Sequence, residues 1–186
     1  SGILAFDVSD PLSPVAVADI AGVMVADSPQ DMAIAGDWLY TTTTSGALHV
    51  FDISGAHPVN ANYFGASGNN IEKIALSTSE IAFATTGGML SVYASNIPSM
   101  LWMGSLSGVN DIAIANNKIY AASDAGLYVA DFQGGHILPP PALESVNARG
   151  RAIKQLEIVN GKLYAATDDD RAFVYDLQDM DDLNYV

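Results

Sequence analysis

Two series of short, alternating apolar segments recur in step along the chain, and this repeat limits the possible folds more than any other feature. The first series ends at a fixed position that is held in turn by Asp7, Asp52, Ala94, Asp131 and Asp176. The second series has its register at Leu39, Ile81, Ile119 and Leu163. The mean period is about 42 residues, which is typical of repeat architectures. The chain is therefore expected to repeat one structural unit.

Each unit contains four expected strands. A short apolar run, a polar turn and a β-rich run form a hairpin pattern, with turns at Gly36-Asp37, Ser79-Glu80, Asn116-Asn117 and Asn160-Gly161. The segment that ends at the fixed Asp position follows as a third strand, and a fourth strand comes after a turn rich in Gly and Pro. We name these four strands A to D in chain order.

Four short antiparallel strands in about 42 residues are the pattern of a β-propeller blade. A single four-stranded sheet of this kind cannot bury both apolar faces alone, whereas stacked blades cover one another. The sequence therefore predicts an all-β fold of about four and a half blades that form part of a larger propeller or assembly. The expected boundaries are a half blade at 1–22 and blades at about 23–66, 67–107, 108–146 and 147–186.

The repeat resembles the LVIVD family of β-propellers, which is named for a third strand of that sequence. ILAFDVSDPLSPVAVADI, from Ile3 to Ile20, matches this pattern closely, and LHVFDISGAHPVNANYFG matches it next best. The match weakens where Ala94 replaces the Asp. Members of that family occur in surface or secreted bacterial and archaeal proteins. The resemblance therefore implies an extracellular or cell-surface module that has a structural or interaction role.

Composition excludes several classes of partner. The 186 residues carry 21 acidic and 7 basic side chains, a formal charge of −14, and no base precedes Lys73. Such a surface repels nucleic acid, so no nucleic-acid partner is expected. The sequence has no run of 18 or more apolar residues, so no insertion into a membrane is expected. The absence of cysteine excludes thiolate catalysis and Cys-based zinc sites.

Few residues are candidates for chemistry. The strand-end aspartates are expected to accept N–H bonds from the following turn, and Tyr40, Tyr120 and Tyr164 are expected to pack between blades. His49, His57 and His136 lack metal-binding or catalytic spacing. No cofactor is expected, although the carboxylates of Asp168, Asp169 and Asp170 are the type of ligand that Ca²⁺ takes.

We expect no enzymatic activity. The alternative is an enzyme or ligand-binding propeller whose site lies at the mouth of the central channel, in the loops between D and A strands. The ionisable residues there are Asp27, Asp31, Glu72, Asp111, Arg149 and Arg151. A group of acids without a nucleophile or a histidine makes a poor catalyst for most reactions.

The ends of the repeat predict a protein partner. The first 22 residues supply strands C and D without A and B, and Asn184-Tyr185-Val186 reads as the start of a last D strand. Unpaired strand edges promote association, so we expect the partner to be another copy of the chain or the rest of a longer chain. Head-to-tail contacts between copies would build an open filament unless the rotation closes them into a ring. The expected interface residues are Ile3, Leu4, Phe6, Val15, Val17, Ile20, Tyr185 and Val186.

Overall fold

The computed structural model describes residues 3–4, 6–16, 28–55, 59–65, 71–77, 79–94, 100–132, 144–146 and 150–178. Every regular element within these ranges is a β-strand, which confirms the predicted all-β class. No helix capable of spanning a membrane occurs in the described part of the chain. The chain divides into two compact units, Ser1–Glu72 and Lys73–Val186, and each is described by itself.

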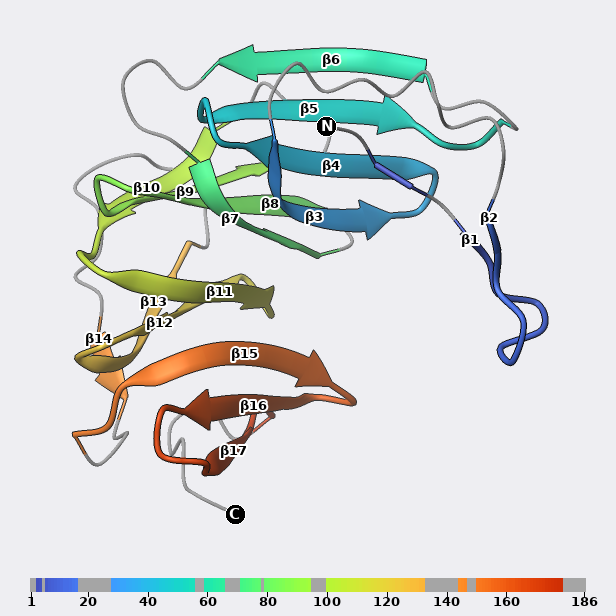
Figure 1. The fold of residues 1–186 in the computed structure, drawn as a ribbon. Helices are drawn as coiled ribbons and strands as arrows, with labels where there is room; N and C mark the ends of the chain where they lie inside the picture. The colour runs from blue at the N-terminus through green and yellow to red at the C-terminus, as the bar shows by residue number, and fades with distance from the viewer. Residues whose placement is uncertain are drawn as a thin grey trace. The chain divides into compact units, whose positions relative to one another are not determined.

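The first unit holds a short hairpin and one four-stranded antiparallel sheet (Figure 1). The hairpin consists of β1 (Phe6–Asp7) and β2 (Val15–Ala16). The sheet has the order β3-β4-β5-β6, with bounds Pro29–Ala35, Trp38–Thr43, Ala47–Asp52 and Val59–Gly65. These strands coincide with the expected A to D strands, and β1 and β2 fall within the expected C and D segments of the half blade.

The second unit repeats the same sheet. One sheet runs β7 (Ile71–Leu76), β8 (Glu80–Thr85), β9 (Met89–Ala94) and β10 (Met100–Ser105), with β7 straddling the boundary between the units. The next runs β11 (Val109–Ala115), β12 (Lys118–Ser123), β13 (Gly126–Asp131) and β14 (Glu144–Val146). Three strands, β15 (Ile153–Val159), β16 (Lys162–Thr167) and β17 (Ala172–Asp176), form the last described sheet. The D strand expected at 184–186 lies outside the described residues.

The hairpin turns between A and B strands share one backbone geometry. Gly36, Asn116 and Asn160 occupy the same place in three repeats and have φ angles of 57°, 52° and 51°. Glycine and asparagine tolerate this left-handed conformation better than other residues. In these three repeats, the polar turns that the sequence indicated therefore set the register of the A–B pair.

Three of the four strand-end aspartates act as turn residues, as predicted. Oδ1 of Asp7, Asp52 and Asp176 each accepts the backbone N–H two residues later, at 2.9 Å in every case. The hydrogen bonds from Ser9 to Asp7, from Ser54 to Asp52 and from Gln178 to Asp176 lower the pKa of these carboxyl groups. Each aspartate thus closes its C strand and starts the following turn.

Sheets of the second unit stack through two different faces. We call the face toward the preceding sheet the leading face and the face toward the following sheet the trailing face. Ala82 and Ala84 on the trailing face of β7–β10 pack with Ile112 and Ile114 on the leading face of β11–β14. The next interface repeats this arrangement with Ala113, Tyr120 and Ala122 on one side and Leu156, Leu163 and Phe173 on the other. The core of the second unit is therefore built from such interfaces.

Tyr120 of β12 is fully buried in the second of these interfaces, against the sheet β15–β17. Burial raises the pKa of the Tyr120 phenol from 10.0 to about 12, and the nearby Asp131 carboxylate adds to this shift. The unfolded chain therefore releases this proton at lower pH than the folded chain does. Its contribution to stability is complete below about pH 10 and is lost as the pH rises toward 12.

We expect the free energy of unfolding to fall between pH 10 and 12 by up to about 1.4 kcal/mol per pH unit through this one group. In the Tyr120→Phe variant, this part of the pH dependence should be missing. Urea unfolding curves at pH 8, 10 and 11.5 measure the difference. An equally steep decline in both proteins would show that other groups cause it.

Candidate functional site

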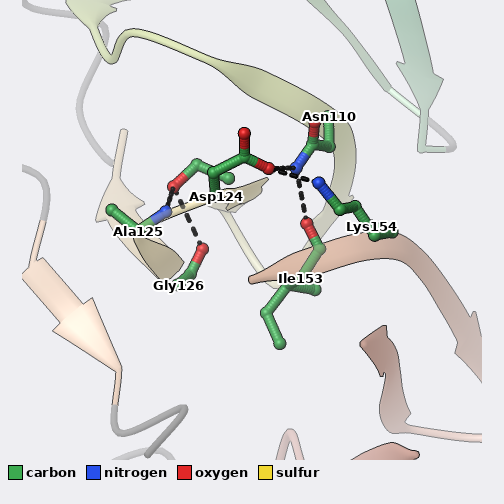
Figure 2. A network of polar contacts seen from close by, with 7 residues as sticks. Asn110, Asp124, Ala125, Gly126, Ile153 and Lys154 are labelled. Carbon is green, nitrogen blue, oxygen red and sulfur yellow. Dashed lines mark hydrogen bonds and ion pairs between the residues drawn. The ribbon is translucent and has the colours of Figure 1, made fainter. Parts of the chain in front are cut away.

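A polar network joins the start of β11, the turn between β12 and β13, and the start of β15 (Figure 2). Asn110 Nδ2 donates to Asp124 Oδ1 at 2.9 Å and to the backbone oxygen of Ile153 at 2.8 Å. Lys154 forms an ion pair with the same Asp124 oxygen. The hydrogen bonds from Lys154 and from Asn110 lower the pKa of Asp124. The network ties two adjacent sheets together at their solvent-exposed ends.

Ser123, the residue before Asp124, stabilises the turn that carries this aspartate. Ser123 Oγ accepts the Ala125 N–H at 3.1 Å and donates to the Gly126 backbone oxygen at 3.3 Å. Gly126 has a φ of 131°, which residues with a Cβ rarely adopt. The turn therefore presents the Asp124 carboxylate toward Asn110 and Lys154, as Figure 2 shows.

Asp111 makes a second link between the same two sheets. Its Oδ1 accepts the Ile112 N–H at 2.9 Å, and its Oδ2 accepts the Leu156 N–H at 2.8 Å. Both oxygens therefore bond to backbone amides, one on its own strand and one on the neighbouring sheet. A carboxylate used in this way positions two strands and is poorly available as a general base.

Of the other ionisable residues considered for a channel-mouth site, the structure describes Arg151, Asp31 and Glu72. Arg151 pairs with Asp169, and Asp31 Oδ1 accepts the Met32 N–H at 3.0 Å. Glu72 is half-buried on β7. Asp27 and Arg149 lie outside the described residues.

The three consecutive carboxylates in the β16–β17 turn have different surroundings. All three are exposed, but Asp169 also contacts Arg151 and Arg171 and accepts a hydrogen bond from Thr167 Oγ1. The guanidinium groups of Arg151 and Arg171 would compete with a metal cation for the Asp169 carboxylate. Across the ranges that the structure describes, no three His, Asp or Glu side chains are grouped so that they could hold a metal ion. The Ca²⁺ hypothesis remains without structural support.

Of the three histidines, the structure describes His49. His49 is buried on β5, where its ring lies nearly parallel to that of Phe51, with centroids 6.1 Å apart. This placement agrees with a packed strand residue. His57 and His136 lie outside the described residues.

Two apolar surfaces are open at repeat positions that are buried elsewhere in the chain. Tyr164 on the trailing face of β15–β17 is 40% exposed, whereas Tyr120 at the same position of the preceding sheet is 0% exposed. Phe6 on β1 is 51% exposed, whereas Phe51 at the same position of β5 is 2% exposed. The prediction that the three tyrosines pack between blades is thus wrong for Tyr164, because no described sheet covers its face.

The residues expected at an interface are distributed unevenly. Leu4, Phe6 and Val15 are exposed, as that expectation requires. Ile3 instead turns toward the neighbouring sheet and packs against Leu39 and Phe51. Val17, Ile20, Tyr185 and Val186 lie outside the described residues. The sequence did not single out Met32 and Ile34, which are also exposed; their place on an apolar A strand gave no signal of this.

The repeated four-stranded sheets and their face-to-face stacking define a β-propeller fold, and solved structures resemble the chain over most of its length. The Cps50 (Swd1) β-propeller domain from Myceliophteria thermophila gives a TM-score of 0.66 at 14% identity, covering 86% of this chain and 55% of that one. BamB from Moraxella catarrhalis gives 0.60 at 17% identity, covering 82% of this chain and 48% of that one.

The computationally designed Ika4 protein gives a TM-score of 0.63 at 13% identity, with 83% of this chain and 94% of that chain covered. By contrast, the chain spans only about half the length of Cps50 (Swd1) and BamB, the two natural propellers above. No family model matches the sequence. No curated protein matches it either. At these identities the similarity to solved structures establishes the fold alone.

Proposed function

We propose that the chain is a non-enzymatic structural and interaction module that binds protein through its open blade faces. The observation that carries the proposal is the contrast at equivalent repeat positions, where Phe6 and Tyr164 are exposed and Phe51 and Tyr120 are buried. Large aromatic side chains of this kind are stabilised by covering them. The surfaces proposed to bind a partner are thus the blade faces that carry Phe6 and Tyr164.

The partner in this proposal is another copy of the chain, in a head-to-tail arrangement. Phe6 belongs to a leading face and Tyr164 to a trailing face, and these are the two kinds of face that pack together inside the second unit. A contact between unlike faces leaves one of each free, so it can continue from copy to copy and build a filament. The rest of a longer polypeptide could supply the same faces.

A location outside the cytoplasm, on a cell surface or in a secreted assembly, completes the proposal. Its support is the resemblance to LVIVD repeats in the segment from Ile3 to Ile20, together with the acidic composition. The structural use of Asp111 and the pairing of Arg151 favour an interaction role over the enzymatic alternative.

Self-association of the wild-type chain should increase with concentration, and Phe6→Asp or Tyr164→Asp should each weaken it by about tenfold or more, because a charge then faces the apolar partner surface. Light scattering over a concentration series measures this. Leu12→Asp is the matched control, since Leu12 is also an exposed apolar residue but lies in the β1–β2 turn, away from both faces. A wild-type chain that stays monomeric at all concentrations contradicts the proposed self-assembly.

A further inference from the structure

The first residue of each B strand lies directly opposite the residue that ends the C strand of the same sheet. In the four repeats these cross-strand pairs are Trp38 with Asp52, Glu80 with Ala94, Lys118 with Asp131, and Lys162 with Asp176. Directly opposite side chains of an antiparallel pair lie on one face, with Cβ atoms about 4.5–5.5 Å apart. The four pairs can therefore be compared as one position of the repeat.

Charge is matched at this position in the sheets of the second unit. Two of these sheets place a lysine opposite the strand-end aspartate, and Lys162 Nζ lies 3.5 Å from Asp176 Oδ2. In the third sheet Glu80 replaces the lysine, and Ala94 replaces the aspartate. This double change avoids two carboxylates directly opposite each other, which would destabilise the pair. In the described sheets of this unit, a strand-end aspartate thus always faces a lysine.

The first unit departs from this pattern. Asp52 ends β5, but Trp38 of β4 holds the position of the lysine. Residues 1–72 contain no Lys or Arg, so the sequence of this unit supplies no other base to the carboxylate. A carboxylate and an indole side chain therefore lie side by side at the end of the β4–β5 pair.

The two oxygens of the strand-end carboxylate have different roles. Oδ1 of Asp176 accepts the Gln178 N–H, and its Oδ2 pairs with Lys162. Oδ1 of Asp52 likewise accepts the N–H and the hydroxyl group of Ser54, at 2.9 and 2.6 Å. Within the described part of the chain, no hydrogen bond or ion pair reaches Oδ2 of Asp52. This is the oxygen that binds an ammonium group in the equivalent aspartate.

Trp38 is open to solvent because of its place in the sheet. It is 41% exposed, although Leu39 and Tyr40 directly after it are buried. Lys118 holds the same position in the β11–β14 sheet, which packs against a neighbouring sheet on each face, and it is still partly exposed. Stacking therefore leaves this end of the B strand accessible, and the exposure of Trp38 does not depend on a missing strand or sheet.

We propose that Trp38 and Asp52 form a recognition site for an arginine side chain of a partner protein, which supplies the positive charge that lysine supplies within the second unit. The indole face attracts a guanidinium group by cation–π interaction. The planar guanidinium also donates to a carboxylate while it stacks on an aromatic ring, which an ammonium group does less well. The hydrogen bonds from Ser54 lower the pKa of Asp52, so its carboxylate is charged at neutral pH.

This inference rests on the proposed interaction role and names the chemistry of one partner group. The probe is the peptide acetyl-Gly-Arg-Gly-amide, titrated into the isotope-labelled full chain at low salt and pH 8, where histidines are uncharged. The NMR signals of the Trp38 indole N–H and of the Ser54 backbone N–H should shift in a saturable way. The same peptide with citrulline in place of arginine keeps the shape without the charge, and should shift neither signal.

Trp38→Lys is the most direct variant, because it gives Asp52 the internal lysine of the other repeats. Followed at the Ser54 signal, it should weaken peptide binding by about tenfold or more. Leu12→Lys is the matched control, since it adds the same charge at an exposed residue of the β1–β2 turn and should leave the affinity within about twofold. Asp52→Asn keeps a side-chain oxygen for the turn and should weaken binding by about threefold or more, so the test holds even if Trp38→Lys impairs folding.

Equal shifts with the citrulline peptide, equal affinities of Trp38→Lys and Leu12→Lys, or the absence of a saturable shift would overturn the arginine site. If the wild-type chain self-associates by light scattering but the arginine peptide shifts neither signal, only this site fails. If the peptide binds to a chain that stays monomeric at all concentrations, the proposed self-assembly fails and the arginine site stands.

Discussion

Replacing Ile114 with alanine is expected to lower the free energy of unfolding by about 2–5 kcal/mol, whereas Ile34→Ala is expected to change it by less than about 0.5 kcal/mol. The two isoleucines hold the same position on β11 and β3, and each is the partner of a B-strand residue, Ile119 and Leu39. They differ in that the β7–β10 sheet covers Ile114, while Ile34 is mostly exposed.

Urea unfolding followed by intrinsic fluorescence compares the two variants with the wild-type chain. A shift in the midpoint without a change in slope would show that stability alone has changed. Similar losses at both positions would mean that Ile34 is covered in solution, either within the chain or by another copy. Repeating the Ile34→Ala measurement at low protein concentration separates these cases, because only association depends on concentration.

The strand pattern was predictable because it depends on local sequence. Alternation fixes which side chains share a face, and polar turns such as Asn160-Gly161 fix the hairpin register, so β15 and β16 lie where the repeat indicated. The turn role of Asp52 was also readable, since an aspartate at a strand end bonds to a backbone N–H two residues away.

Burial at a repeat position was not predictable, because it depends on the neighbouring sheet and not on the residue itself. Tyr120 and Tyr164 share the same repeat position, yet one is buried and the other is exposed. The link from Asp111 to the Leu156 N–H gave no sequence signal either, since the equivalent positions hold Asp31, Lys73 and Gln155. The ion pair of Arg151 with Asp169 depends instead on contacts within one sheet, where the pairing of Ile153 with Thr167 brings the two segments together.

Gly88→Ala is expected to lower the free energy of unfolding by about 2–5 kcal/mol, because it adds a steric clash to a strained backbone conformation. Gly88 lies in the turn between β8 and β9 with a φ of 76°. A Cβ there would lie 2.7 Å from the backbone oxygen of Leu106. Its own oxygen accepts the Leu106 N–H at 2.7 Å, so the backbone cannot move away without losing this bond.

Gly36 provides the matched comparison, since its φ is 57° and nothing lies within 4 Å of an added Cβ. Gly36→Ala should therefore cost only about 1–2 kcal/mol, the strain of a left-handed residue. Gly36→Asn should cost less still, because Asn116 and Asn160 adopt the same conformation in the equivalent turns. Thermal or urea unfolding of the three variants gives the order directly. If Gly88→Ala costs no more than Gly36→Ala, the close approach of Leu106 to this turn does not persist in solution, and the end of β10 is free to shift away from Gly88.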